Sequence, residues 1–272
     1  YRYHLGPDIQ VGNIYPVMYA KTFFDGMKAE GQENIINLLR CAWAGSQKYG
    51  ALVWSGDIKS SFPSMKNQVA AGLNMGIAGI PWWTTDIGGF FGANINDPEF
   101  HELLVRWFEY GCFCPVMRLH GYRWPLQPQY GTTGGATCVS GAPNEVWSYT
   151  DQVCEILSDY LRLRERMLPY ITELMEEAHE KGTPVMRPLF YDFPEDKESW
   201  NVETEYMFGP KVLVKPITDA DARETDVYLP GGASWTNAWT GETFEGGQKV
   251  HVAAPIEQIP LFTRDGYKLP MK

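Results

Sequence analysis

The sequence predicts a parallel α/β unit, either a barrel or an open sheet, followed by a small antiparallel β domain. In the first part of the chain, continuously apolar runs alternate with helical segments. This alternation is typical of parallel strands that are buried on both faces and joined by right-handed crossovers. After a Gly-Thr-Pro break at 182–184, the segments become short and alternate in polarity, as in an antiparallel sheet. The length of 272 residues and the 44% hydrophobic content suit one large domain or two smaller ones.

Four short apolar runs are the predicted parallel strands. Each is bounded by polar residues, glycine or proline, and is too short for a buried helix. The link between the first two runs, residues 42–50, leaves little room for a helix. The four runs are Ile35–Ala42, Gly50–Trp54, Ile77–Trp83 and Phe113–Leu119.

Helical segments flank these runs. Tyr15–Glu30 precedes the first run, and Pro63–Met75 begins with proline in its first turn. Asp97 is a predicted N-cap, because proline follows it and a helical pattern continues to about Tyr110. A Gly/Pro-rich excursion covers residues 122–143, and a long amphipathic helix is predicted over Thr150–Lys181.

The predicted boundary between the two parts falls near residue 183, giving domains of 1–182 and 183–272. Beyond it, short segments alternate in polarity and are separated by Gly, Pro and Asp, which predicts an antiparallel sheet or small β-sandwich. These segments are 211–218, 224–230, 233–241, 248–255 and 257–266.

Charge and composition exclude several kinds of partner. The net charge of −10 and the pI near 5.0 provide no basic surface, so neither nucleic acid nor an anionic membrane is an expected partner. No run of about 18 apolar residues suggests a transmembrane helix. The chain begins at Tyr1 rather than Met, so we expect an excised segment that would lack any N-terminal signal.

The five cysteines indicate no disulfide framework. Their number is odd, and no CxxC pair or histidine cluster suggests zinc. We therefore expect reduced thiols in a cytoplasmic protein. The cysteines are Cys41, Cys112, Cys114, Cys138 and Cys154.

Polar and aromatic side chains recur where the apolar runs end. The carboxyl ends of parallel strands share one face of a barrel or open sheet, so these groups are predicted to converge there. Aromatic rings beside carboxylates suit sugars, because rings cover the apolar face of a pyranose and carboxylates bind hydroxyls or transfer protons. The groups are Arg40, Trp54–Asp57, Trp82–Phe90 and Arg118–His120.

Each of these residues also has a structural interpretation. An Asp directly after a strand is often a turn residue or N-cap, so Asp57 or Asp86 alone suits a structural role as well as a functional one. His120 alone is more often a structural hydrogen-bonding group, and Arg40 could belong to a structural ion pair. Recurrence at successive strand ends favours a site. The Gly-rich stretch 130–138 lacks a GK[ST] ending and is interpreted as a flexible excursion.

Several motifs resemble glycoside hydrolase family 31, the α-glucosidase and α-xylosidase family. They include "RCAWAGSQKYGALVWSGD", "GLNMGIAGIPWWTTDIGGF" and "FCPVMRLHG", and the similarity continues through "RMLPYI", "GTPVMRPLF" and "MFGPKVLVKPI". The resemblance spans nearly the whole chain. It implies the second half of a (β/α)8 barrel followed by a small antiparallel β-sandwich domain, in a glycosidase that needs no metal or organic cofactor.

The resemblance also implies roles for individual residues. Asp57, in the W-[ST]-G-D motif, corresponds to the general acid/base of a retaining α-glycosidase that hydrolyses terminal α-linked glucosyl or xylosyl residues. Five other residues correspond to positions that line the subsite of the reacting sugar. They are Arg40, Trp54, Asp86, Phe90 and His120.

One departure from the family pattern concerns the nucleophile. Family members carry it on an earlier barrel strand, and no such motif occurs in the first 35 residues. A whole barrel takes roughly 250 residues, so the first 182 fit only half of one. We expect pairing with the missing N-terminal half, or self-association, and an inactive isolated chain. The alternative is a non-catalytic carbohydrate-binding or assembly module.

Overall fold

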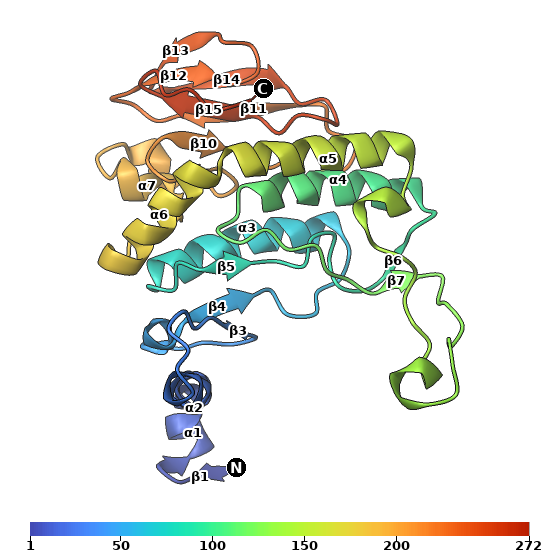
Figure 1. Cartoon of the computed structure of the whole chain (residues 1–272). Helices are drawn as coiled ribbons and strands as arrows, with labels where there is room; N and C mark the ends of the chain where they lie inside the picture. The colour runs from blue at the N-terminus through green and yellow to red at the C-terminus, as the bar shows by residue number, and fades with distance from the viewer. Residues whose placement is uncertain (272) are drawn as a thin grey trace.

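A computed structural model describes residues 1–271 of the chain. The N-terminal helix α2 and the C-terminal sheets lie at opposite ends of the molecule (Figure 1). Between them lie a small parallel sheet and the helices α3, α4 and α5, which are stacked above one another in this view. The prediction of an α/β part followed by an antiparallel β part is confirmed.

Three of the four predicted runs contribute to a parallel sheet, but the prediction for Ile77–Trp83 is wrong over most of its length. Ile77 ends helix α3, Ala78 and Gly79 form a turn, and only Trp83 of this run lies in a strand. Strands β3 (Asn37–Leu39), β4 (Ala51–Trp54) and β5 (Trp83–Thr84) are neighbours in the order β3-β4-β5. Both pairs are parallel, with Asn37 opposite Ala51 and Val53 opposite Trp83. The carboxyl ends of all three strands therefore reach the same edge of the sheet. The short link after β3 contains a 3-10 turn, η2 (Ser46–Tyr49), in place of a crossover helix.

The strand predicted over Phe113–Leu119 is wrong in its first half. Phe113 and Cys114 form a buried turn after helix α4 (Pro98–Cys112), with their N–H groups bonded to the Tyr110 and Gly111 carbonyls. Pro115 has no N–H to donate, so a strand ladder cannot begin before residue 116. From there the chain runs beside β5, with the Val116 N–H 3.1 Å from the Trp83 oxygen and one parallel bridge between Ile87 and Leu119.

The first three predicted helices are confirmed. Helix α2 covers Tyr15–Ala29 and is preceded by the short helix α1 (Asp8–Val11). Helix α3 (Phe62–Ile77) is capped by the Ser61 hydroxyl, which accepts the Ser64 N–H at 3.3 Å. In α4 the Asp97 carboxylate accepts the Glu99 N–H at 3.0 Å. These caps satisfy backbone donors that a helix leaves free in its first turn.

The single long helix predicted over residues 150–181 is in fact two helices. Helix α5 covers Asp151–Arg166, and helix α6 covers Leu168–Lys181. Met167 caps both helices and is buried at their junction. Pro169 causes the break. In a continuous helix its ring would clash with the carbonyl group four residues earlier, and it has no N–H to donate to that carbonyl.

Part of the predicted excursion at 122–143 is ordered by strand pairing. Strand β7 (Arg123–Trp124) runs parallel to β6 (Ala93–Asn94). Beyond it, the 3-10 turn η3 (Gly134–Thr137) lies in an irregular stretch. At the start of the chain, β1 (Arg2–Tyr3) pairs with β2 (Gly6–Pro7).

The C-terminal part contains two antiparallel sheets that share an apolar core. One has six strands in the order β13-β12-β15-β10-β9-β8, and the other pairs β11 with β14. The core includes Trp235 and Phe262 from the larger sheet and Leu229 from the smaller one. The strands are β8 (Met186–Pro188), β9 (Tyr206–Phe208), β10 (Val212–Val214), β11 (Glu224–Leu229), β12 (Ser234–Asn237), β13 (Thr243–Glu245), β14 (Gln248–Ala253) and β15 (Leu261–Arg264).

A buried polar network joins α4 to the C-terminal part. The fully buried Arg106 donates to four carbonyl oxygens of the β part and pairs with Glu109 at 3.1 Å. Burial raises the pKa of the Glu109 carboxyl to about 8, although the Arg106 charge opposes this. The Tyr160 hydroxyl of α5 bonds Glu109 at 3.1 Å. This network fixes the helices against the C-terminal sheets.

Among the described helices, none is both long enough and apolar enough to cross a membrane.

Candidate active site

The predicted site residues follow neighbouring parallel strands. Arg40 comes directly after β3, Asp57 follows β4 by three residues, and Asp86 follows β5 by two. His120 comes after the point where Leu119 bridges to Ile87. Because the strands are parallel, these side chains emerge at one edge of the sheet. This edge is the candidate active site.

Asp57 and Arg40 form an ion pair across two strand ends. The Arg40 Nη1 atom lies 3.4 Å from the Asp57 Oδ2 atom, and both side chains are accessible, with 62% and 42% exposure. Gly56, just before Asp57, has a φ of +72°, a backbone conformation that favours glycine. Strand β4 ends at Trp54, and the left-handed turn at Gly56 presents the Asp57 carboxylate to solvent beside a guanidinium.

Asp86 is a buried carboxylate with one free oxygen. Its Oδ1 atom pairs with Arg118, while Oδ2 has no hydrogen-bond partner among residues 1–271. Burial raises the pKa of Asp86, the charges of Arg118 and His120 oppose that rise, and the charge of Asp57 adds to it. Arg118, His120 and Asp57 therefore lie close enough to Asp86 for their charges to act on its carboxyl.

Two consecutive glycines shape the turn after Asp86. Gly88 and Gly89 have φ values of +84° and +75°. A Cβ atom on Gly89 would lie 2.6 Å from the Ser60 Cα atom, so only glycine allows this approach. The turn thereby packs against the loop that follows Asp57, and it carries Phe90 to the same edge.

Arg123 holds this turn in place and was not predicted from the sequence. The fully buried guanidinium donates to the carbonyls of Gly89 at 2.7 Å and Ile87 at 3.1 Å. It also bonds Asn144 at 3.0 Å and lies over the Phe100 ring at 4.9 Å. An arginine within a Gly/Pro-rich stretch carries no periodicity signal, so no local pattern marked it.

Phe90 and His120 form an aromatic pair at the site. Their ring centroids are 5.5 Å apart and the ring planes meet at 34°. His120 is exposed and Phe90 is partly exposed. The Phe90 N–H donates to the Ile58 carbonyl at 2.7 Å, which fixes the base of its side chain.

Trp54 and Arg40 share a cavity of about 320 Å³. Its other walls come from the exposed aromatic face of α2, from β3 and from Cys41, two residues after β3. They are Tyr15, Pro16, Tyr19, Leu38, Leu39 and Cys41. The indole of Trp54 thus forms an apolar wall on the same side as the Asp57–Arg40 pair.

The six residues predicted from the sequence lie in two groups at this edge of the sheet. Arg40, Trp54 and Asp57 form one group, and Asp86, Phe90 and His120 form the other. Arg118 joins the second group as the partner of Asp86. Within residues 1–271, no cluster of three or more His, Cys, Asp and Glu side chains could hold a metal ion. Chemically, the edge offers one accessible carboxylate, one buried carboxylate and apolar rings.

Two family models match the chain. The glycosyl hydrolases family 31 TIM-barrel domain covers residues 3–174, and the glycosyl hydrolase family 31 C-terminal domain covers residues 182–269. An α-xylosidase from Saccharolobus solfataricus is 37% identical over 97% of this chain and 34% of its own length. Alpha-xylosidase A from Aspergillus niger is 35% identical over 96% of this chain and 38% of its own length.

A solved structure of a GH31 α-xylosidase from a soil metagenome, complexed with xylose, superimposes with a TM-score of 0.94. It is 55% identical, and the match covers 99% of this chain and 40% of that one. The chain thus spans between a third and two fifths of the length of these relatives. The resemblance seen in the motifs is confirmed, and this chain belongs to glycosyl hydrolase family 31.

Proposed function

We propose that this chain provides the acid/base side of the active site of a retaining α-glycosidase. The observation that carries the proposal is a set of two ion pairs at one edge of a parallel sheet. The Asp57–Arg40 pair is solvent-accessible, with 3.4 Å between its charged atoms, and the Asp86 carboxylate of the Asp86–Arg118 pair is buried. Relatives of the chain are named α-xylosidases and α-glucosidases, which supports terminal α-linked xylosyl or glucosyl residues as substrates. The 55% identical structure holds xylose, so an α-xyloside is the first substrate to test.

In the proposed reaction, Asp57 transfers a proton twice. First, the protonated Asp57 donates its proton to the glycosidic oxygen as the bond from that oxygen to the anomeric carbon breaks. A nucleophilic carboxylate forms a covalent bond to the same carbon. Asp57, now ionised, then takes a proton from water as the water oxygen attacks that carbon and displaces the carboxylate. This sequence is the retaining mechanism with two carboxylates.

Asp86 is assigned to sugar binding rather than to nucleophilic attack. It is buried and paired with Arg118, and its free Oδ2 atom is suited to accept a hydrogen bond from a sugar hydroxyl. His120 and Arg40 are polar neighbours, and Trp54 and Phe90 supply apolar walls. We propose that the nucleophile lies on a segment outside these 272 residues, which is consistent with the greater length of the relatives.

We also propose that residues 1–182 form half of the catalytic barrel and residues 183–272 a β-sandwich. The two family models, which end at 174 and begin at 182, support this division. The apolar core shared by the two C-terminal sheets supports a sandwich arrangement.

The acid/base role of Asp57 is tested by Asp57→Asn in the gene product that carries this chain. Turnover of alkyl α-xylosides or α-glucosides should fall by about 10²-fold or more, while aryl substrates with activated leaving groups lose less in the first step. Added azide should restore transfer and form a glycosyl azide. Asp25→Asn, at a surface carboxylate of α2 that is 54% exposed, is the matched control and should leave turnover unchanged. Full activity of Asp57→Asn would refute the assignment.

One observation favours a second candidate, a non-catalytic carbohydrate-binding or assembly module. Retaining hydrolysis needs two carboxylates about 5–5.5 Å apart, and among the described residues Asp86, the other carboxylate of this edge, is already paired with Arg118. The gene product would then bind a xyloside at Trp54 and Asp86 but would hydrolyse neither α-xylosides nor α-glucosides. Hydrolysis that depends on Asp57 would exclude this candidate.

A further inference from the structure

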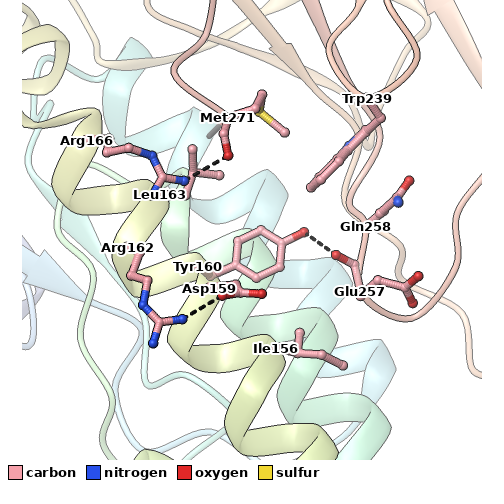
Figure 2. A pocket seen from close by; sticks show the side chains of 10 residues that line it. All are labelled: Ile156, Asp159, Tyr160, Arg162, Leu163, Arg166, Trp239, Glu257, Gln258 and Met271. Atoms are coloured by element: carbon pink, nitrogen blue, oxygen red, sulfur yellow. Dashed lines mark hydrogen bonds and ion pairs between the residues drawn. The ribbon is translucent and has the colours of Figure 1, made fainter.

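A second pocket lies between helix α5 and the C-terminal part of the chain. It has a volume of about 280 Å³ and is bounded by α5 and by loops of the C-terminal sheets (Figure 2). It shares no residue with the candidate active site. Its lining residues are Ile156, Asp159, Tyr160, Arg162, Leu163, Arg166, Trp239, Glu257, Gln258 and Met271.

The walls of this pocket are held in place by hydrogen bonds. The Trp239 Nε1–H donates to the Ile259 carbonyl at 2.7 Å, so the indole is fixed in orientation and offers a ligand its ring rather than its N–H. The Tyr160 hydroxyl donates to the Glu257 carbonyl at 3.1 Å and accepts the Ile259 N–H at 3.0 Å. Arg166 donates to the Met271 carbonyl at 2.9 Å. A pocket with fixed walls costs little to organise on binding.

The chemistry of the lining is that of a site for a neutral, polyhydroxylated ring. Trp239, Leu163 and Ile156 supply apolar surface, and Figure 2 shows the indole across the opening from the α5 side chains. The two carboxylates in the lining are balanced by two guanidiniums, which disfavours a strongly charged ligand. Within residues 1–271, the Glu257 and Gln258 side chains make no hydrogen bond, so their oxygen and nitrogen atoms can bind hydroxyls.

We propose that this pocket is a second sugar-binding site, separate from the site of Asp57, that takes one pyranose ring of a neutral saccharide against the Trp239 indole. Its volume is close to the lower end of ligand pockets, about 300 Å³, so it suits a single ring rather than an extended chain. Such a site would hold a non-reacting part of a saccharide on the protein surface. The inference rests on the proposed function only for its choice of ligand class.

The test uses the indole N–H signals of the ¹⁵N-labelled chain during titration with methyl α-D-xylopyranoside. Trp54 reports on the candidate active site and Trp239 on the second pocket, and each signal is assigned by its loss in a Trp→Phe variant. Trp147, which is 75% exposed and lines neither site, is the internal control. We expect the Trp239 signal to shift saturably while the Trp147 signal does not move.

Two variants separate the sites. In Asp86→Asn the Trp239 shift should persist unchanged. In the double variant Glu257→Ala/Gln258→Ala, the apparent Kd at Trp239 should rise at least tenfold while the Trp54 response is unchanged. A Trp239 signal that does not move at the highest soluble xyloside concentration, or that responds equally in the double variant, overturns the inference. In the unsubstituted chain, a Trp54 signal that does not move while the Trp239 signal shifts saturably counts against the proposed function and leaves this inference intact.

Discussion

The guanidinium of Arg123 donates a hydrogen bond to the Gly89 carbonyl at 2.7 Å, and this contact holds the turn that carries Asp86 and Phe90. The same guanidinium reaches the Ile87 carbonyl at 3.1 Å and is fully buried. A buried arginine is stable only when its donors are satisfied, and here the backbone of the candidate active site satisfies them. Arg123 is therefore a positioning residue for the site.

Arg123→Met should destabilise the chain by about 3 kcal/mol or more, because it leaves buried carbonyls without donors at roughly 1–3 kcal/mol each. Arg123→Lys should cost less, since one ammonium can reach some of these oxygens but not all. Urea unfolding measures both. Arg162→Met, at a residue that is 64% exposed with a single surface ion pair, is the control and should cost under about 1 kcal/mol. Equal losses for Arg123→Met and Arg162→Met would contradict the positioning role.

Gly89→Ala should cost more stability than Gly92→Ala. Both glycines have positive φ values, +75° and +89°, so both substitutions carry the strain of that conformation, about 1–2 kcal/mol. Only at Gly89 would the added Cβ meet backbone, at 2.6 Å from Ser60 Cα, whereas at Gly92 the nearest contact is the Lys59 side chain at 3.7 Å. The difference between the two unfolding free energies isolates the close packing of the turn. Equal losses of unfolding free energy for Gly89→Ala and Gly92→Ala would contradict close packing of the turn against Ser60.

Asp86→Asn should lower kcat/KM for a xyloside or glucoside by about 10²-fold or more in the gene product that carries this chain. The substitution removes the buried charge that Arg118 pairs with and weakens the acceptor for a sugar hydroxyl. A variant with normal kcat/KM would remove Asp86 from the substrate site.

Stability should fall as pH rises from about 4.5 towards 8, because burial raises the pKa of the Glu109 carboxyl to about 8 from 4.5. Across this range the folded state keeps a proton that the unfolded state has released, so the contribution of Glu109 is complete below about pH 4.5 and is lost by about pH 8. One such group gives a slope of up to about 1.4 kcal/mol per pH unit. Glu109→Gln should reduce the slope, and Glu155→Gln, at an exposed position of α5, should not. Urea unfolding at several pH values distinguishes them.

The 272-residue chain alone should show no α-glycosidase activity and should self-associate. Strand β3 is at the edge of the parallel sheet, where its unpaired backbone groups and the exposed side chains of Ile36 (59%) and Leu38 (45%) favour pairing with another strand. Light scattering should detect a dimer or larger species, and Ile36→Lys/Leu38→Lys should shift it towards monomer. A clean monomer that hydrolyses an aryl α-glycoside would contradict this prediction.

Local patterns in the sequence were sufficient to predict most helices and strands. Strand β4 is a continuous apolar run that ends at Trp54, just before Ser55 and Gly56. Helices α3 and α4 follow the N-caps Ser61 and Asp97 and have proline in the first turn. Each of these signals acts within a few residues, so no distant contact was needed to read it. The break at Pro169 had a local signal too, but the amphipathic pattern on both sides of it obscured the boundary.

The apolar run at Phe113–Leu119 shows where such patterns fail. An apolar run of this length is compatible with a buried strand or with a buried turn after a helix, and periodicity does not separate them. The tertiary structure selected the buried turn for Phe113 and Cys114, because both residues are fully buried in the core formed with α5 and the C-terminal sheets.

The sequence by itself determined the family, the alternation of strands and helices, and the positions of Asp57 and Asp86 just after strands, because these depend on residues close together in the chain. Only the tertiary structure decided that Arg118 is the partner of Asp86 and that Arg123 clamps the Gly88–Gly89 turn. These contacts join residues 32 and 34 positions apart, and the choice among possible partners depends on how the strands and helices pack.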